Sequence, residues 1–371
     1  MLQLPLPPRW CRAVSICSGV VTLAWPVALR AQATLVNTLE AFHAPAAVLA
    51  LADGHTLLVS NTGRGEYGLM AGRGSISRVT LDNEGHLAVD KLRFIEGLNG
   101  PVGLTLLATG SEALPAGTLV VSVGGSWMVD AGGRSLPDDA TRGTGLMFFD
   151  VTTGRELGHV LLGSGSAAEK FSGFPITDPT GITSDPAGNI YLTDAAATAT
   201  RAGHGRDARI GITRISRAAL DSLMKNEAPP EGAMQFAEEH SIATTVFYSA
   251  KTDALIWGTF AGELREVPNG DLSGHTAVQT IGKEFGSMAS LGETARGTLV
   301  GVAAEGSLVA MHHGKPRLLR FRKPFQFLSP GQFALLPGAD GHILMILPEQ
   351  GGGGVGPWRQ RVNVVALPGD L

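Results

Sequence analysis

DPTGITSDPAGNIYLTD, residues 178–194, contains two short apolar runs separated by a turn-forming segment. The turn segment holds Asp185, Pro186 and Gly188. These residue types favour tight turns, because Asp bonds to its own backbone, Pro fixes φ and Gly accepts a positive φ. The stretch therefore predicts a β-hairpin of two short strands.

The same pattern returns along the chain. Six copies begin near residues 45, 101, 179, 244, 287 and 330, at intervals of 56, 78, 65, 43 and 43 residues. A third strand is expected after four of them, over residues 75–82, 145–151, 210–216 and 262–268. Repeats of about 40–50 residues are typical of four-stranded propeller blades. Asp53, Asp185, Asp253 and Asp340 are expected to bond to the backbone of the turns between the first and second strands.

The copies predict an all-β fold, a six-bladed β-propeller with four-stranded antiparallel blades. A parallel α/β sheet is disfavoured because regular crossover helices of 10–15 residues are missing. Residues 34–42 or 361–368 are expected to close the ring. One insertion, residues 216–225, is a predicted helix with Ser216 as its N-cap. The segment GSGSAAEK, residues 163–170, is interpreted as a linker.

The first 33 residues have the pattern of an export signal. Arg9 and Arg12 precede an apolar run over residues 13–29, and Ala31-Gln32-Ala33 forms a small-x-small cleavage site. An uncleaved membrane anchor is the alternative, because the run is long for a signal. No later run reaches the 18 residues that a membrane span requires. We expect a signal peptide over residues 1–33, a propeller domain over residues 34–371, and a periplasmic or secreted protein that does not associate with membranes after cleavage.

Cleavage changes the charge and the cysteine content of the chain. It would leave 26 basic against 33 acidic residues, a net charge of −7. A chain of this sign has no general attraction for a phosphate backbone, so nucleic acid is not an expected partner. Both cysteines, Cys11 and Cys17, lie within the signal. The mature chain would therefore have no disulfide and no thiolate metal site.

Residues 178–194 also carry a family resemblance. Their Pro-x-Gly-Ile, Asp-x-x-Gly-Asn-Ile-Tyr-Leu and final Asp resemble an NHL repeat. They are similar to blades of the senescence-marker/gluconolactonase family and its strictosidine-synthase-like relatives. The resemblance implies a six-bladed propeller whose ligands bind at one mouth of the central channel. It implies no single chemistry, because these families include calcium- or zinc-dependent lactonases, lyases and binding modules.

Long loops at one mouth are the expected ligand site. In a propeller, the connections into the innermost strands and those between the second and third strands open on the same face. The second set is long in blades one, two, three and six, and binding groups usually lie on such loops. Their aromatic and arginine side chains suit a polar ligand with carboxylate or hydroxyl groups; the alternative is that the loops only cover the channel. The candidate ligand-binding residues are Asn61, Arg64, Tyr67, Trp127, Asp130, Arg201, Arg206, Trp358 and Arg359.

The resemblance also implies a hard cation, Ca²⁺ or Zn²⁺, bound by a carboxylate near the first blade and by an Asn and an Asp at the channel-facing starts of later inner strands. Thr180 stands where the family pattern Pro-Asn-Gly has its Asn, and His43-Ala44-Pro45 replaces a Glu-Gly-Pro pattern. Asn99 and Asp178 are the nearest remaining candidates for metal ligands. The predicted ligand set is therefore incomplete.

Two functions remain open. The first is a propeller that binds a small polar ligand or a partner protein without turnover. The second is a divalent-metal-dependent hydrolase or lyase of the lactonase type, in which His204, beside Arg206 and Asp207, is the candidate for acid–base catalysis. The incomplete metal pattern favours the first.

Overall fold

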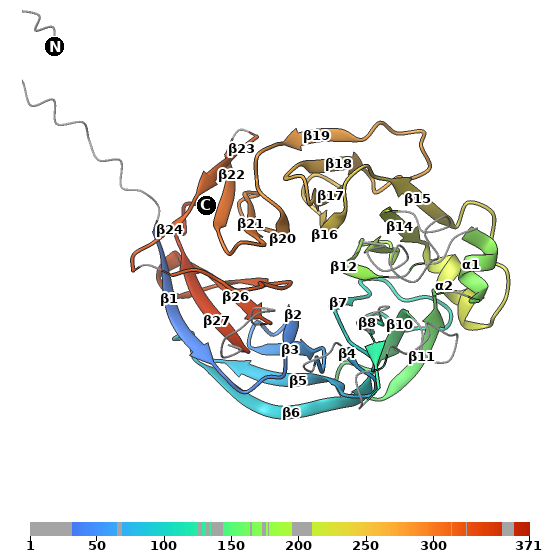
Figure 1. The fold of residues 1–371 in the computed structure, drawn as a ribbon, viewed down its shortest axis with the longest axis horizontal. Coiled ribbons are helices and arrows are strands. Elements are labelled where there is room, and N and C mark those ends of the chain that lie inside the picture. Colours follow the sequence, from blue (N-terminus) through green and yellow to red (C-terminus); the bar gives the residue numbers. More distant parts are fainter. Residues whose placement is uncertain are drawn as a thin grey trace, which may run out of the picture. The chain divides into compact units, whose positions relative to one another are not determined.

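The structure is a computed structural model, and it describes residues 32–64, 69–124, 128–130, 134, 144–163, 165–172, 176, 178–194, 210–312, 314–323, 325–350 and 360–371. These residues form six sheets arranged as blades around an axis (Figure 1). The four main strands of each blade pair antiparallel, and in blades one to five they follow one another in sequence across the sheet. The prediction of a six-bladed propeller is confirmed.

The first three blades each contain four strands. Blade one is β2 (Pro45–Ala50), β3 (Thr56–Asn61), β5 (Gly74–Leu81) and β6 (Leu87–Leu98). Blade two is β7 (Gly103–Leu106), β8 (Leu119–Val123), β10 (Gly145–Phe149) and β11 (Glu156–Leu161). Blade three is β12 (Pro179–Ser184), β13 (Ile190–Asp194), β14 (Gly211–Ile215) and β15 (Met234–Glu238).

The last three blades complete the ring. Blade four is β16 (Ala243–Ser249), β17 (Ala254–Thr259), β18 (Leu264–Pro268) and β19 (Gln279–Gly282). Blade five is β20 (Met288–Glu293), β21 (Leu299–Ala303), β22 (Leu308–His312) and β23 (Lys315–Leu318). Blade six is β25 (Ala334–Pro337), β26 (Ile343–Glu349), β27 (Arg361–Leu367) and β1 (Gln32–Leu39), with the short β24 (Arg320–Phe321) along the edge of β1; η1 (Ala339–Gly341) precedes β26. The four predicted third strands are β5, β10, β14 and β18.

Burial on both faces of the blades explains why the strands read as continuous apolar runs. Successive side chains of a strand point to opposite faces of its sheet. In β3, Leu57 and Val59 pack in the cluster shared with blade six, whereas Leu58 packs in the cluster shared with blade two. The six apolar clusters of the described residues lie between the six pairs of neighbouring blades.

The N-terminal strand closes the ring. β1 pairs antiparallel with β27, with Leu35 opposite Val365, so blade six combines both ends of the described chain. The predicted closing segments, residues 34–42 and 361–368, meet in this pairing. β1 begins two residues before the predicted cleavage site, because Gln32 and Ala33 pair with β24 and Ala33 is fully buried.

A buried charge network lies beneath this closure. Glu349, at the end of β26, is fully buried and accepts hydrogen bonds from the Arg361 guanidinium and from Asn363 Nδ2 at 2.8 Å. Its other oxygen accepts the Leu328 amide. Asn363 in turn accepts a 3.0 Å bond from the Thr38 hydroxyl of β1. The buried carboxylate therefore has partners for both oxygens, which offsets the cost of its desolvation.

Hydrogen bonds at the start of the inner strands join each blade to the next. The Thr180 hydroxyl of blade three donates to the Ala243 carbonyl of blade four at 3.2 Å, and the Ser290 hydroxyl of blade five accepts the Phe333 amide of blade six at 3.1 Å. Gln332, which precedes blade six, forms hydrogen bonds to two other blades. Its backbone bonds to residues of blade one, and its side-chain amide makes two bonds to the backbone of Leu104 in blade two, at 2.9 and 3.3 Å.

Two turn predictions and one helix prediction are confirmed. Asp53 and Asp185 accept backbone N–H groups of their own turns. α2 (Arg217–Met224) has Ser216 as its N-cap, with the Ser216 hydroxyl accepting the Ala219 amide at 3.1 Å. It packs Leu220 into the cluster between blades two and three.

The linker interpretation of residues 163–170 is wrong for its second half. α1 (Ala167–Ser172) begins there, because the Ser166 hydroxyl accepts the Glu169 amide at 3.0 Å and Ala168 is buried in the same cluster. Neither α1 nor α2 approaches the length or apolar character of a membrane span, and the described residues contain no other α-helix.

Candidate functional site

A pocket of about 280 Å³ lies at blade one, at the end where β3 finishes and the chain enters β2. In an antiparallel blade this end is also the start of the third strand, so the pocket opens on the face where the long loops were expected. The lining residues are Ala41, Phe42, His43, Asn61, Gly63, Met70, Arg73, Ser75, Leu92 and Arg93. The cavity is close to the lower limit of typical small-ligand sites.

Asn61 holds two walls of this pocket together. Its side chain is buried; Oδ1 accepts the His43 amide at 3.2 Å and Nδ2 donates to the Ser77 hydroxyl at 2.9 Å. The Ser77 hydroxyl then donates to the carbonyl of Leu92 in β6. The predicted ligand-binding residue therefore lines the pocket, and most of its bonding capacity fixes the pocket's walls.

An irregular pairing in β6 gives the pocket its outer wall. Ile76 pairs with Ile95 and Arg78 with Lys91, so β6 advances four residues where β5 advances two. The two additional residues fall at the segment that contains Leu92 and Arg93. Bulges of this kind redirect side chains and often lie beside functional sites.

Close backbone contacts hold the connection between β3 and β5. Gly63 has a φ of +69°, and a Cβ there would lie 2.5 Å from the carbonyl carbon of Arg73. The Gly72 amide donates to Asn99 Oδ1 at 2.8 Å. Asn99, a predicted metal ligand, thus anchors the pocket loop of the neighbouring blade.

A two-stranded parallel sheet joins the long loops of blades one and two. β4 (Leu69–Met70) pairs with β9 (Met128–Val129), with Met70 opposite Val129. Asp130 follows β9 and forms an ion pair with Arg134 at 2.8 Å. The prediction that these loops gather on one face is confirmed for blades one and two.

Blade three places two carboxyl groups together at the same face. The Asp178 amide donates to Asp194 Oδ1 at 2.9 Å, and the Asp194 side chain is buried. Desolvation by burial and the repulsion of Asp194 raise the pKa of Asp178 to about 7. In the folded state, the Asp178 carboxyl group is therefore mostly protonated below about pH 7.

Four equivalent positions at the starts of the inner strands supply no carboxylate to a hard-cation site. In four inner strands the pairing with the second strand skips one residue at the equivalent position. The skipped residues are Ala46, Thr180, Thr244 and Ala289, and none of them has a carboxylate. The hydroxyls of Thr180 and Thr244 donate to carbonyls of the next blade. Asn99 and Asp178 stay predictions as metal ligands, but these neighbours supply no charged oxygen donor.

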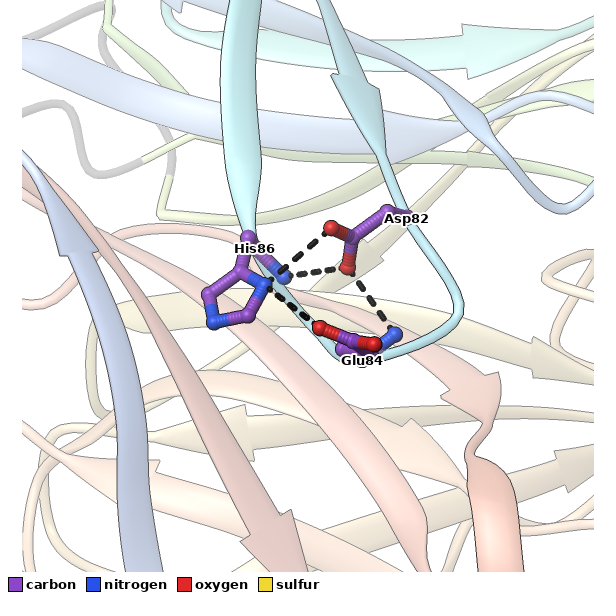
Figure 2. A group of neighbouring side chains, drawn as sticks. All are labelled: Asp82, Glu84 and His86. Atoms are coloured by element: carbon purple, nitrogen blue, oxygen red, sulfur yellow. Dashed lines mark hydrogen bonds and ion pairs between the residues drawn. The ribbon is translucent and has the colours of Figure 1, made fainter.

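A carboxylate–histidine group lies at the opposite end of blade one. Figure 2 shows Asp82, Glu84 and His86 in the exposed turn between β5 and β6. Asp82 accepts the amides of Glu84 and His86 at 2.9 and 2.8 Å, and the His86 ring lies 3.1 Å from its second oxygen. The hydrogen bond from the His86 backbone amide is the largest of the effects that lower the pKa of Asp82. These hydrogen bonds are those of a hairpin turn, and they explain why the three side chains lie close together.

The remaining predicted site residues are placed only in part. Arg64 is exposed, and its backbone forms an isolated antiparallel β-bridge with Leu69 in the loop between β3 and β5. Tyr67, Trp127, Arg201, His204, Arg206, Trp358 and Arg359 lie outside the described residues. Sequence reasoning missed Ser75 and Arg93, whose positions depend on the β5–β6 register rather than on any local pattern.

Comparisons with known proteins agree on the fold. No family model matches this sequence, and no curated protein sequence matches it. Solved structures with a similar fold include a luciferin-regenerating enzyme, at 10% identity and a TM-score of 0.51, covering 89% of this chain and 93% of that one. Another is the β-propeller domain of Cps50 (Swd1) from Myceliophteria thermophila, at 14% identity and a TM-score of 0.50, covering 91% of this chain and 100% of that one. A gluconolactonase from Xanthomonas campestris has 12% identity and a TM-score of 0.49, covering 92% of this chain and 99% of that one. The likeness to the luciferin-regenerating enzyme and to the Cps50 domain confirms the propeller fold alone, and a propeller fold selects no activity.

The carboxyl pair of blade three predicts a pH-dependent effect of Asp178→Asn. Because the folded-state pKa of Asp178 is about 7 against 3.8 for the free side chain, its protonation favours the fold at acid pH, and this stabilisation is lost as pH rises from about 4 to 7. Asp178→Asn should therefore raise the Tm more at pH 8 than at pH 5. The control Asp150→Asn, at an exposed carboxylate whose pKa is lowered chiefly by the Thr153 amide, should give the same Tm difference at both values. A pH-independent effect of Asp178→Asn would contradict the prediction.

The two loop glycines allow a matched comparison. Gly63 and Gly72 have φ values of +69° and +68°, but a Cβ at Gly72 has no neighbour within 4 Å. Both alanine variants carry the backbone strain of about 1–2 kcal/mol, and only Gly63→Ala must also displace the Arg73 backbone. Gly63→Ala should lower the free energy of unfolding by roughly 1–2 kcal/mol more than Gly72→Ala, measured by urea denaturation. Equal losses would show that the contact with Arg73 is unimportant.

Proposed function

We propose that this chain is an exported β-propeller that binds a small polar ligand in the blade-one pocket, beside one mouth of the central channel. The observation that carries the proposal is the cavity of about 280 Å³ with the predicted residue Asn61 in its wall.

The size of the cavity favours a small molecule over a protein partner. A protein interface of standard size buries about 800 Å² on each partner, far more than this concave site offers. The fixed walls also favour binding, because a pre-formed site loses less conformational entropy when a ligand enters. A partner protein remains the alternative ligand of the same face.

A metal-dependent hydrolase or lyase receives less support. Ca²⁺ would need several oxygen ligands, among them carboxylates, and Ala46, Thr180, Thr244 and Ala289 do not supply them. Binding in the blade-one pocket requires none of these positions.

Matched ligands test the proposal. Phenylacetate, phenylacetamide and phenethylamine share one apolar body and differ in charge, as do hexanoate, hexanamide and hexylamine. At least one of the six should bind wild-type protein in isothermal titration calorimetry, and treatment with EDTA should leave the affinity unchanged. Ser75→Leu, which places a larger side chain in the pocket wall, should weaken that binding by about tenfold or more, since overpacking a formed site is unfavourable.

Thr80→Leu is the matched control, because Thr80 is an exposed residue of the same strand and does not line the pocket. It should leave the affinity unchanged. The proposal fails if none of the six compounds binds to folded wild-type protein, or if Ser75→Leu and Thr80→Leu, with unaltered circular dichroism, have the same effect.

Export is the second part of the proposal, and the charged start, the apolar run and the Ala31-Gln32-Ala33 pattern support it. Cleavage after Ala33 would remove the two residues of β1 that pair with β24. We expect the protein recovered from the periplasm or medium of an expressing bacterium to begin at Thr34 by intact mass. A chain that stays in the cytoplasm with residues 1–33 attached would contradict export.

A further inference from the structure

We propose that the blade-one pocket selects small organic acids, with Arg73 and Arg93 holding the carboxylate and Leu92 and Met70 contacting an apolar body. The inference rests on the proposed function and names the chemical class of its ligand. It draws on the charge of the lining, the exposure of its apolar residues, the pairing of β6 and the size of the cavity.

The lining is cationic on a chain that is anionic as a whole. The chain has a net charge of −4, yet the described residues that line the pocket include Arg73, Arg93 and His43 and no Asp or Glu. Arg93 has only a distant ion pair, 3.9 Å from Glu96, and both of these side chains are largely exposed. No hydrogen bond or ion pair joins the Arg73 side chain to another residue of the described part. Both guanidinium groups are therefore available to a carboxylate, whose geometry they match.

The lining also contains apolar side chains, and one of them is partly open to solvent. Leu92 is 45% exposed, although it lies in a strand whose neighbours Phe94 and Ile95 are buried. Phe42 and Met70 lie beside it in the lining. An exposed leucine at a pocket would be covered by the hydrocarbon part of a ligand, and its burial would favour binding.

The strand pairing explains how one segment presents both kinds of contact. The additional residues in β6 place Leu92 and Arg93 in an irregular segment, and the Ser77 hydroxyl bonds to the Leu92 carbonyl. Asn61 fixes that hydroxyl from the other side at 2.9 Å. The backbone that carries Leu92 and Arg93 is thus held in place before any ligand arrives, as a specific site requires.

The volume limits the size of the acid. At the packing density of protein interiors, about 280 Å³ holds roughly a dozen non-hydrogen atoms. Phenylacetate has ten, so it fits the cavity with its ring and carboxylate together. Phenylacetamide has the same shape and no charge, which makes the pair a direct test of the arginines.

The experiment measures both compounds by titration calorimetry at pH 7 and low salt. Wild-type protein should bind phenylacetate at least about tenfold more tightly than phenylacetamide, since charged hydrogen bonds are stronger than neutral ones. Arg73→Gln and Arg93→Gln should each weaken phenylacetate binding by about tenfold and leave phenylacetamide binding nearly unchanged. The control Arg296→Gln removes an exposed arginine from the turn between β20 and β21 and should change neither affinity.

The outcomes separate this inference from the proposed function. If the acid and the amide bind equally well, or if Arg73→Gln and Arg93→Gln bind phenylacetate as wild type does while Ser75→Leu prevents binding, the pocket is correct and the choice of organic acids is wrong. Equal losses in Arg73→Gln and Arg296→Gln would assign the effect to net charge and also overturn the inference. If no compound of the six-member panel binds, the proposed function itself fails.

Discussion

Hydrogen bonds between the starts of neighbouring inner strands hold the blades of this propeller in place around the axis. Serine and threonine hydroxyls supply several of them, as Thr180 does toward Ala243 and Ser290 does for Phe333. The apolar clusters between blades provide most of the favourable free energy of folding, but such contacts have little directional preference. The hydroxyl bonds add direction, so each blade meets the next in one register and the loops at the mouth have fixed starting points.

The candidate site depends on this fixed frame. Asn61 ends β3 and bonds to both sides of the pocket, and Asn99 reaches from the entry of blade two to the loop of blade one. These are contacts between connections that start from well-held strands. The same frame explains why a metal site is poorly supplied: Thr180 and Thr244 use their hydroxyls to join blades, which leaves fewer oxygen donors at the channel.

The sequence predicts what local patterns encode. The hairpin of residues 178–194, the cap at Ser216 and the third strands all depend on neighbours a few residues away, and each is confirmed. Other features depend on pairings across strands and blades, which no local pattern encodes. They are the exposure of Leu92, the hydrogen bond from Gly72 to Asn99 and the proximity of Asp178 to Asp194. α1 was missed because its helix-forming residues follow a glycine- and serine-rich segment and are too few to show a period. Asn61 lies in the pocket lining because it ends a second strand, a position that follows from the repeat, and its role in ligand binding stays a prediction.

The pairing of β1 with β27 has a consequence for biosynthesis. Thr38 bonds to Asn363, 325 positions later, so a ribosome must complete nearly the whole polypeptide before the circle can shut. Until then β1 has no antiparallel neighbour, and nascent chains or chains truncated before β27 present an open strand to other proteins. Contacts so distant in sequence slow folding.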